Sequence, residues 1–208
     1  MREKSKILSR NPISYAGYLA RMEQWVDEGA SSGALQNEAM SRYTALNLRR
    51  MRRIDKQLRL KLELVEAVNE MDTAVVCIAI TESWCGDAAQ NLPYLAALSE
   101  HCSNMELALV LRDDNPDYMD AFLTNGGRSI PKAIFYRKED EQPFATWGPR
   151  PKPLQSMVME YKSRVGEKMS FEKFAESVQL WYKQDAGQHI QKELLSIFRS
   201  SKELSLAK

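Results

Sequence analysis

Hydrophobic residues recur every three or four positions near both ends of this chain, whereas its middle holds short, continuous apolar runs. The helical spacing over residues 13–27 predicts a first amphipathic helix. Glycines and serines over residues 29–33 predict a loop, and a second helical pattern starts near Asn37. Leucines alternate at positions 58, 60, 62 and 64, so a break or a short extended piece near Leu60 stays open.

The middle of the chain predicts alternating strands and helices. Residues 74–81 form an apolar run that is typical of a strand covered on both faces. The following elements are a helix over 88–102 that Pro93 should kink, a strand over 105–111, a short helix over 117–123, strands over 132–136 and 144–148, and a helix over 151–164. This order predicts an α/β sheet whose first strand–helix–strand connection is parallel and right-handed.

The pattern divides the chain into three parts. Residues 1–70 form a predicted N-terminal helical extension, residues 71–166 a central α/β domain, and residues 167–208 a C-terminal helical segment that packs on the same core. In the last part, residues 170–198 predict one or two helices interrupted near Gly187, and the polar residues 199–208 are expected to fray.

Composition narrows the class of protein without naming a function. The 208 residues include 29 basic and 28 acidic side chains, so overall charge favours neither a nucleic-acid binder nor a membrane-surface protein. No run approaches the roughly 18 apolar residues of a spanning helix, and no apolar signal-peptide core follows the basic residues 1–6. Three cysteines do not make a disulfide framework, so we expect a cytoplasmic protein.

Basic residues gather between Arg49 and Lys61, opposed only by Asp55. One interpretation is a basic helix that contacts RNA, DNA or an acidic partner. The simpler interpretation is a solvated outer face, because the apolar residues of the same stretch lie at the spacing of one buried face.

Cys85 is the strongest candidate for chemistry. It follows the apolar run 74–81 and precedes the helix predicted over 88–102, so it lies on the turn between a buried strand and a helix N-terminus. Unpaired N–H groups and the helix dipole favour a thiolate there. Asp87 would offset part of that effect, and we expect a moderately acidic thiol. A two-cysteine redox site would carry its second thiol three residues on, where this chain has Ala88.

Two motifs resemble the thioredoxin fold. Trp84-Cys85-Gly86 is similar to the start of its active-site motif, and Ser129-Ile130-Pro131 is similar to the cis-proline loop that faces the cysteine. The longer stretches 82–87 and 127–131 look like a bacterial thioredoxin-like family with an added N-terminal helical region. The resemblance covers roughly residues 23–164 and implies a central mixed β-sheet flanked by helices, with helical extensions at both ends.

The resemblance also implies site residues. Cys85 would be the nucleophile, and the substrate-binding residues would be Trp84, Gly86, Asp87, Arg128, Ile130, Pro131 and Trp147. A cis Pro131 would leave the backbone of Ile130 free to hold an extended peptide or glutathione. The two tryptophans would form apolar walls around the thiol or be core residues, and Arg128 would pair with a carboxylate of glutathione or a peptide or be a solvated loop residue. The buried carboxylate that the family commonly has six residues before the first cysteine is replaced by Ala79.

Three functions remain open at this point. In the first, Cys85 attacks a protein disulfide or a glutathionylated cysteine, and glutathione or another low-molecular-weight thiol resolves the product. In the second, the site is a non-catalytic module that binds an extended peptide or protein. The third, an iron–sulfur scaffold shared across a dimer, fits less well because the motif differs from that of the monothiol glutaredoxins. His101 and His189 lack metal-ligand spacing with the cysteines, so we expect no metal site and no bound cofactor.

Overall fold

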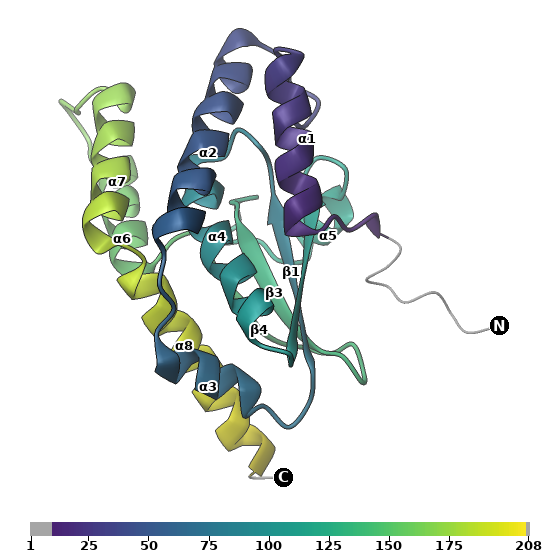
Figure 1. The fold of residues 1–208 in the computed structure, drawn as a ribbon. Helices are drawn as coiled ribbons and strands as arrows, with labels where there is room; N and C mark the ends of the chain where they lie inside the picture. Colours follow the sequence, from purple (N-terminus) through teal and green to yellow (C-terminus); the bar gives the residue numbers. More distant parts are fainter. Residues whose placement is uncertain (1–9, 207–208) are drawn as a thin grey trace.

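The computed structural model describes residues 10–206, and the side chains of residues 10–202 (Figure 1). The basic residues 1–6 lie outside this range, as do residues 207 and 208. Three helices precede the sheet: α1 (Tyr15–Asp27), α2 (Glu38–Gln57) and α3 (Leu62–Asn69). The central elements are β1 (Val75–Thr81), α4 (Gly86–His101), β2 (Met105–Leu111), α5 (Pro116–Asp120), β3 (Lys132–Arg137), β4 (Pro143–Trp147) and α6 (Lys152–Ser163). The chain closes with α7 (Phe171–Asp185) and α8 (Gln188–Leu206).

The four strands form one mixed sheet in the order β2-β1-β3-β4. β1 pairs with β2 in parallel and with β3 antiparallel, and β4 pairs with β3 antiparallel as a hairpin. Every residue of β1 is buried, as expected for a central strand covered on both faces. The predicted fold class, a mixed sheet flanked by helices with further helices at both ends, is confirmed.

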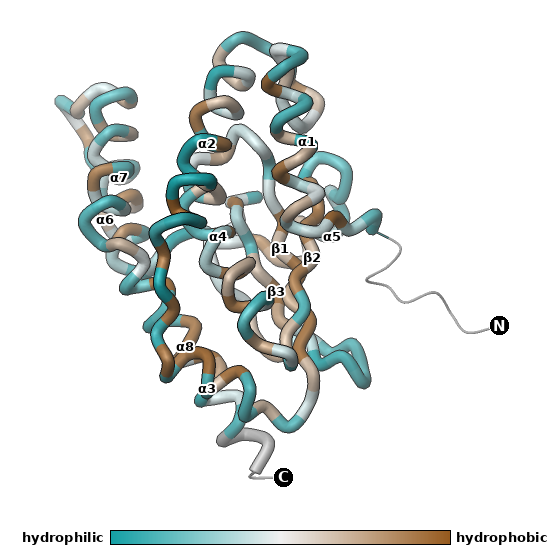
Figure 2. The backbone as a smooth tube through the Cα atoms, viewed as in Figure 1, coloured by the Kyte–Doolittle hydropathy of each residue, from teal (hydrophilic) through white to brown (hydrophobic). Residues whose placement is uncertain are grey.

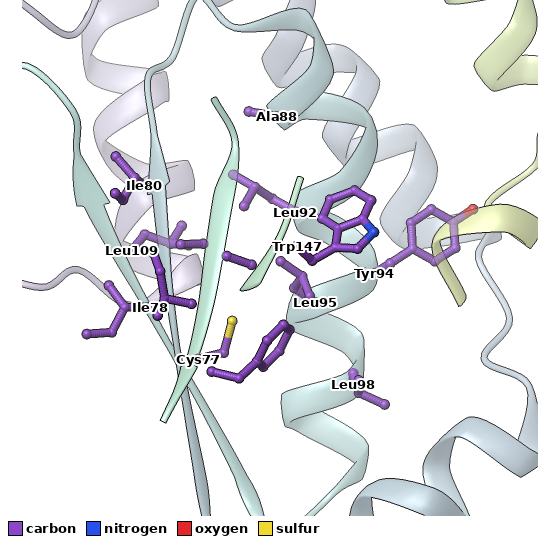
Figure 3. Close-up of a cluster of buried hydrophobic side chains, with 14 of the residues drawn as sticks. Cys77, Ile78, Ile80, Ala88, Leu92, Tyr94, Leu95, Leu98, Leu109 and Trp147 are labelled. Atoms are coloured by element: carbon purple, nitrogen blue, oxygen red, sulfur yellow. The ribbon is translucent and has the colours of Figure 1, made fainter. Parts of the chain in front are cut away.

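The helix α4 supplies much of the apolar core over this sheet. Leu92, Leu95 and Leu98 are fully buried, and Figure 3 shows Leu92 and Leu95 between the helix and the strands. Cys77 points from β1 into this cluster and is fully buried, which makes it a core residue. The helix runs through Pro93 without interruption.

The N-terminal helices are attached to the sheet and to each other. Ile13 exchanges two backbone hydrogen bonds of 2.8 Å with Leu109 on the outer edge of β2, and α2 packs on α4. The open question near Leu60 is settled by a break between α2 and α3. Gln191 of α8 holds this break, because its side-chain oxygen accepts from Lys61 N at 2.7 Å and its amide donates to the carbonyl of Arg59.

The C-terminal helices differ in how they are held. α6 and α7 form a hairpin with its own small apolar cluster, made of Leu154, Val158, Val178 and Tyr182. α8 instead packs against α3, α4 and β4, and Figure 2 shows hydrophobic residues where α8 and α3 lie together. The prediction that residues 199–208 fray is wrong for 199–206, because α8 continues to Leu206. Phe198 is fully buried, and Lys202 forms an ion pair with Glu70.

Within residues 10–206, the helices are too short or too polar for any of them to cross a bilayer.

Gly148 lies where the end of β4 passes the loop that carries Pro131. Its φ is +110°, and a Cβ atom there would lie 2.3 Å from the carbonyl oxygen of Pro131. A residue with a side chain cannot adopt this backbone conformation without strain. The carbonyl oxygen of Pro131 is part of the backbone, so it cannot move aside as a flexible side chain could. Only glycine therefore allows the last strand to approach the loop this closely.

We expect Gly148→Ala to lower the free energy of unfolding by more than about 1 kcal/mol. Gly126→Ala is the matched control, since Gly126 also has a positive φ, +74°, but open space around its Cβ position. Urea unfolding followed by circular dichroism measures both. Equal losses in the two variants would show that backbone strain alone, and not the contact with Pro131, requires glycine at position 148.

Candidate functional site

Cys85 is the N-cap residue of α4, on the turn that follows β1. Its sulfur accepts a hydrogen bond from the backbone N–H of Ala88 at 3.4 Å and donates one to the carbonyl oxygen of Ile130 at 3.3 Å. The Ile130–Pro131 peptide bond is cis. The structure thus brings together the two motifs that the sequence separates by more than forty residues, and the thiol bridges them.

The thiol is less acidic than its position at a helix N-terminus suggests. Only 7% of Cys85 is exposed, and burial, together with the negative charge of Asp87, raises its pKa to about 12. The N–H of Ala88 and the charge of Arg150 oppose this shift without overcoming it. The expectation of a moderately acidic thiol is therefore wrong for the resting protein, because loss of hydration outweighs the helix terminus.

Asp87 is enclosed by partners from the C-terminal part of the chain. Its carboxylate forms an ion pair with Arg150 at 2.6 Å and accepts a hydrogen bond from the Tyr182 hydroxyl at 2.8 Å. Asn91 donates to the Asp87 carbonyl at 2.8 Å and to the Tyr182 hydroxyl at 3.0 Å. Burial raises the pKa of Asp87 even so, with Arg150 acting in the opposite direction. Asp87 therefore joins α4 to α7 and to the segment before α6.

A buried polar network holds the residues just before Cys85. Ser32, in the loop between α1 and α2, donates to the Glu82 carboxylate and accepts from the Ser83 N–H at 2.7 Å. The Ser83 hydroxyl in turn accepts from the Ser32 N–H at 2.9 Å and shares a hydrogen bond of 2.8 Å with Thr44. Asn47 of α2 donates to the Ser83 carbonyl at 2.9 Å.

The sequence gives little sign of this network. Ser32 looks like an ordinary loop residue, and Thr44 and Asn47 lie on a helix whose basic outer face is more conspicuous. The one available signal is that these two polar residues fall on the apolar side of α2, together with the buried Leu48 and Met51.

The other predicted site residues are placed differently. Trp84 is half-buried, with the Arg112 guanidinium 4.9 Å from its ring centre. Trp147 is 4% exposed and donates its indole N–H to Glu193 of α8 at 2.7 Å, so it is a core residue (Figure 3). Arg128 is exposed, and both of its hydrogen bonds, each 2.7 Å, go to Asp120. Its predicted partner, a substrate carboxylate, would have to displace that ion pair.

Two cavities lie along α4, and Cys85 lines neither of them. One, of about 440 Å³, lies between α2, α4 and the turn from α7 to α8, and its wall includes Asn91 and Tyr182. The other, of about 600 Å³, lies between α1, the end of α2 and α4. Cys77, Cys85 and Cys102 are free and buried. Within residues 10–202, no group of three or more His, Cys, Asp or Glu side chains is arranged to hold a metal ion.

Comparison with known proteins identifies the class. The sequence profile of a thioredoxin family matches residues 33–162, well over half of the chain, and the protein belongs to this family. The match begins in the loop that contains Ser32 and ends in α6, so it includes Cys85 and Pro131. No curated protein matches the chain.

Two solved structures have the same fold. One is a protein of unknown function from Pseudomonas aeruginosa, with 17% identity, a TM-score of 0.57, and coverage of 91% of this chain and 99% of the other. The second is an HIV epitope scaffold, with 18% identity, a TM-score of 0.55, and coverage of 90% and 99%. The coverage shows that the shared fold extends over most of this chain and is not confined to the sheet.

We expect Ser32→Ala to lower the free energy of unfolding by about 1–3 kcal/mol, because it removes one donor from the buried Glu82 carboxylate and the acceptor of the Ser83 N–H. Ser103→Ala, at an exposed position, is the control and should change stability little. Chemical denaturation measures both. A loss no larger than that of the control would show that water or a rearranged Glu82 replaces the Ser32 hydroxyl.

The raised pKa of Cys85 predicts a steep pH dependence of its alkylation. The rate should increase about tenfold for each pH unit between about pH 7 and pH 10 without levelling, because the thiolate fraction grows throughout that range. Asp87→Asn should raise the rate at any one pH, since it removes a charge that raises this pKa. Iodoacetamide labelling with peptide mapping reads Cys85 separately from the other cysteines. A rate that levels off below about pH 9 would contradict the raised pKa of Cys85.

Proposed function

We propose that the protein catalyses thiol–disulfide exchange through Cys85 alone, with an external thiol completing each cycle. The observation that carries this proposal is the position of the Cys85 sulfur between the N–H of Ala88 and the carbonyl of Ile130. The Ala88 N–H stabilises a thiolate. The Ile130 carbonyl belongs to the backbone with which an extended peptide would form hydrogen bonds. Membership of the thioredoxin family supports the same chemistry.

Binding of a substrate peptide would activate the thiol. In the resting site the sulfur is protonated at pH 7, because burial raises the pKa of Cys85 to about 12. A peptide N–H that pairs with the Ile130 carbonyl replaces the Cys85 S–H as its donor. The sulfur then keeps the Ala88 N–H, which favours its anionic form, and the S–H proton passes to solvent.

The reaction balances in two steps. The Cys85 thiolate attacks one sulfur of the substrate disulfide, so that a new S–S bond forms, the old one breaks, and the substrate's other sulfur leaves as a thiolate. Because Ala88 stands where a second thiol would be, an external thiolate such as glutathione attacks the Cys85 mixed disulfide and releases the Cys85 thiolate. The product is a disulfide between the substrate and the external thiol, and the protein is unchanged.

A second candidate function is peptide binding without turnover. The burial of Cys85 and its raised pKa favour this function, since both slow attack on a disulfide. In that case the Cys85 S–H serves to hold the Ile130 loop, and Cys85→Ser, which also donates a hydrogen bond, would keep the function.

Intact-mass spectrometry after incubation with glutathione disulfide, whose peptide N–H groups can pair with the Ile130 carbonyl, distinguishes the two. Exchange predicts one adduct at Cys85, its removal by added reduced glutathione, and no adduct in Cys85→Ser. The Cys102→Ser variant is the control and should react as the wild type does. Absence of an adduct at a pH where free cysteine reacts fully would leave the binding module as the function of this site.

A further inference from the structure

Arg50 of α2 lies directly over the residue that follows the reactive cysteine. A Cβ atom built on Gly86 would lie 3.6 Å from Arg50 Nη1, so the guanidinium is in contact range of the first turn of α4. Gln179 of α7 approaches the same position to 3.2 Å. The side chains of α2 and α7 thus flank the backbone next to Cys85, and the absence of a side chain at Gly86 leaves room for them.

Most N–H groups of the Arg50 guanidinium have no acceptor within residues 10–202. Arg50 is half-buried, and it makes one hydrogen bond among residues 10–202, of 2.9 Å, to the side chain of Asn47. No carboxylate in that part of the chain forms an ion pair with it, although a guanidinium carries five N–H groups. Burial, followed by the charge of the neighbouring Arg53, lowers its pKa. A cation in such surroundings gains from an anionic partner, because it has already lost part of its hydration.

The negative charge of Asp87 attracts Arg50 but forms no ion pair with it. Its carboxylate pairs with Arg150 and accepts from Tyr182, so it is not free to hold Arg50. Asn47 has a further role in fixing Arg50, because its amide binds the Ser83 carbonyl while its oxygen accepts from the guanidinium. The cation is therefore held in place relative to the turn that carries Cys85.

From this arrangement we infer that Arg50 is a specificity-determining residue, which selects disulfides that carry a carboxylate close to the sulfur that Cys85 attacks. A guanidinium can bind a carboxylate through two parallel N–H bonds, which orients the substrate as well as attracting it. Glutathione disulfide and acidic peptides share this chemistry. The inference rests on the proposed exchange function.

The test compares three small disulfides of different charge. Dithiodipropionate carries two carboxylates, bis(hydroxyethyl) disulfide is neutral, and cystamine carries two ammonium groups. The rate of mixed-disulfide formation at Cys85 is measured by mass spectrometry at one pH, and each rate is divided by that of N-acetylcysteine with the same disulfide. We expect the wild type to prefer the anion over the neutral probe, and the neutral probe over the cation.

Arg50→Gln should reduce the anion-to-neutral rate ratio by about fivefold. The ratio is informative because any effect of the substitution on the pKa of Cys85 acts on all three probes equally and cancels. Arg49→Gln is the matched control, since Arg49 is the exposed neighbour on the same helix and carries the same charge. A ratio that is unchanged in Arg50→Gln, or reduced equally in Arg49→Gln, would overturn the inference.

Failure of the exchange function would look different, because neither glutathione disulfide nor any of the three small disulfides would react. Binding of thiodipropionate, the thioether analogue that cannot exchange, then tests the inference by itself. In an NMR titration we expect shifts of the Gly86 backbone amide that saturate in the wild type and in Arg49→Gln and that are lost in Arg50→Gln. Absence of saturable shifts in the wild type would overturn the inference.

Discussion

The hydrogen bonds between Ser32 and the pair Glu82–Ser83 are the constraint on which the rest of the site depends. Burying the carboxylate of Glu82 is costly, and its pKa is raised by that burial, so the surrounding donors must be supplied by the fold. They come from the Ser32 hydroxyl and from the N–H of Asp113 at 2.9 Å. The backbone N–H of Ser32 donates to the Ser83 hydroxyl, and the N–H of Ser83 donates to the Ser32 hydroxyl. These reciprocal hydrogen bonds fix the loop between α1 and α2 against the turn before Cys85.

This arrangement gives the added helices a role in the site itself. The α2 helix contributes Thr44 and Asn47 to the buried network, and one turn later it contributes Arg50 over Gly86. On the other side, α7 contributes Tyr182 to Asp87. The turn that carries Cys85 is therefore enclosed between helices from both ends of the chain, and its thiol is more buried and less acidic than the motif alone suggests.

Opposing effects of the surrounding groups set the protonation state of Cys85. The N–H of Ala88 and the charge of Arg150 favour the thiolate, while burial and Asp87 favour the thiol. The second pair is stronger in the resting protein. The S–H also donates to the carbonyl of Ile130, so the protonation of the sulfur is tied to the cis-proline loop.

The sequence by itself determined the order of elements, the fold class and the position of Cys85 at the start of a helix. Apolar periodicity and turn residues are local properties, so they could be read along the chain, and the two motifs were sufficient to pair Cys85 with the Ile130–Pro131 loop. Tertiary structure decided the rest. Trp147 became a core residue and Arg128 paired with Asp120, while Ser32, Asn47, Arg50 and Tyr182 gathered around the turn. Burial and hydrogen bonding between distant segments set these roles and the pKa of the thiol, and neither leaves a periodic signal in the sequence.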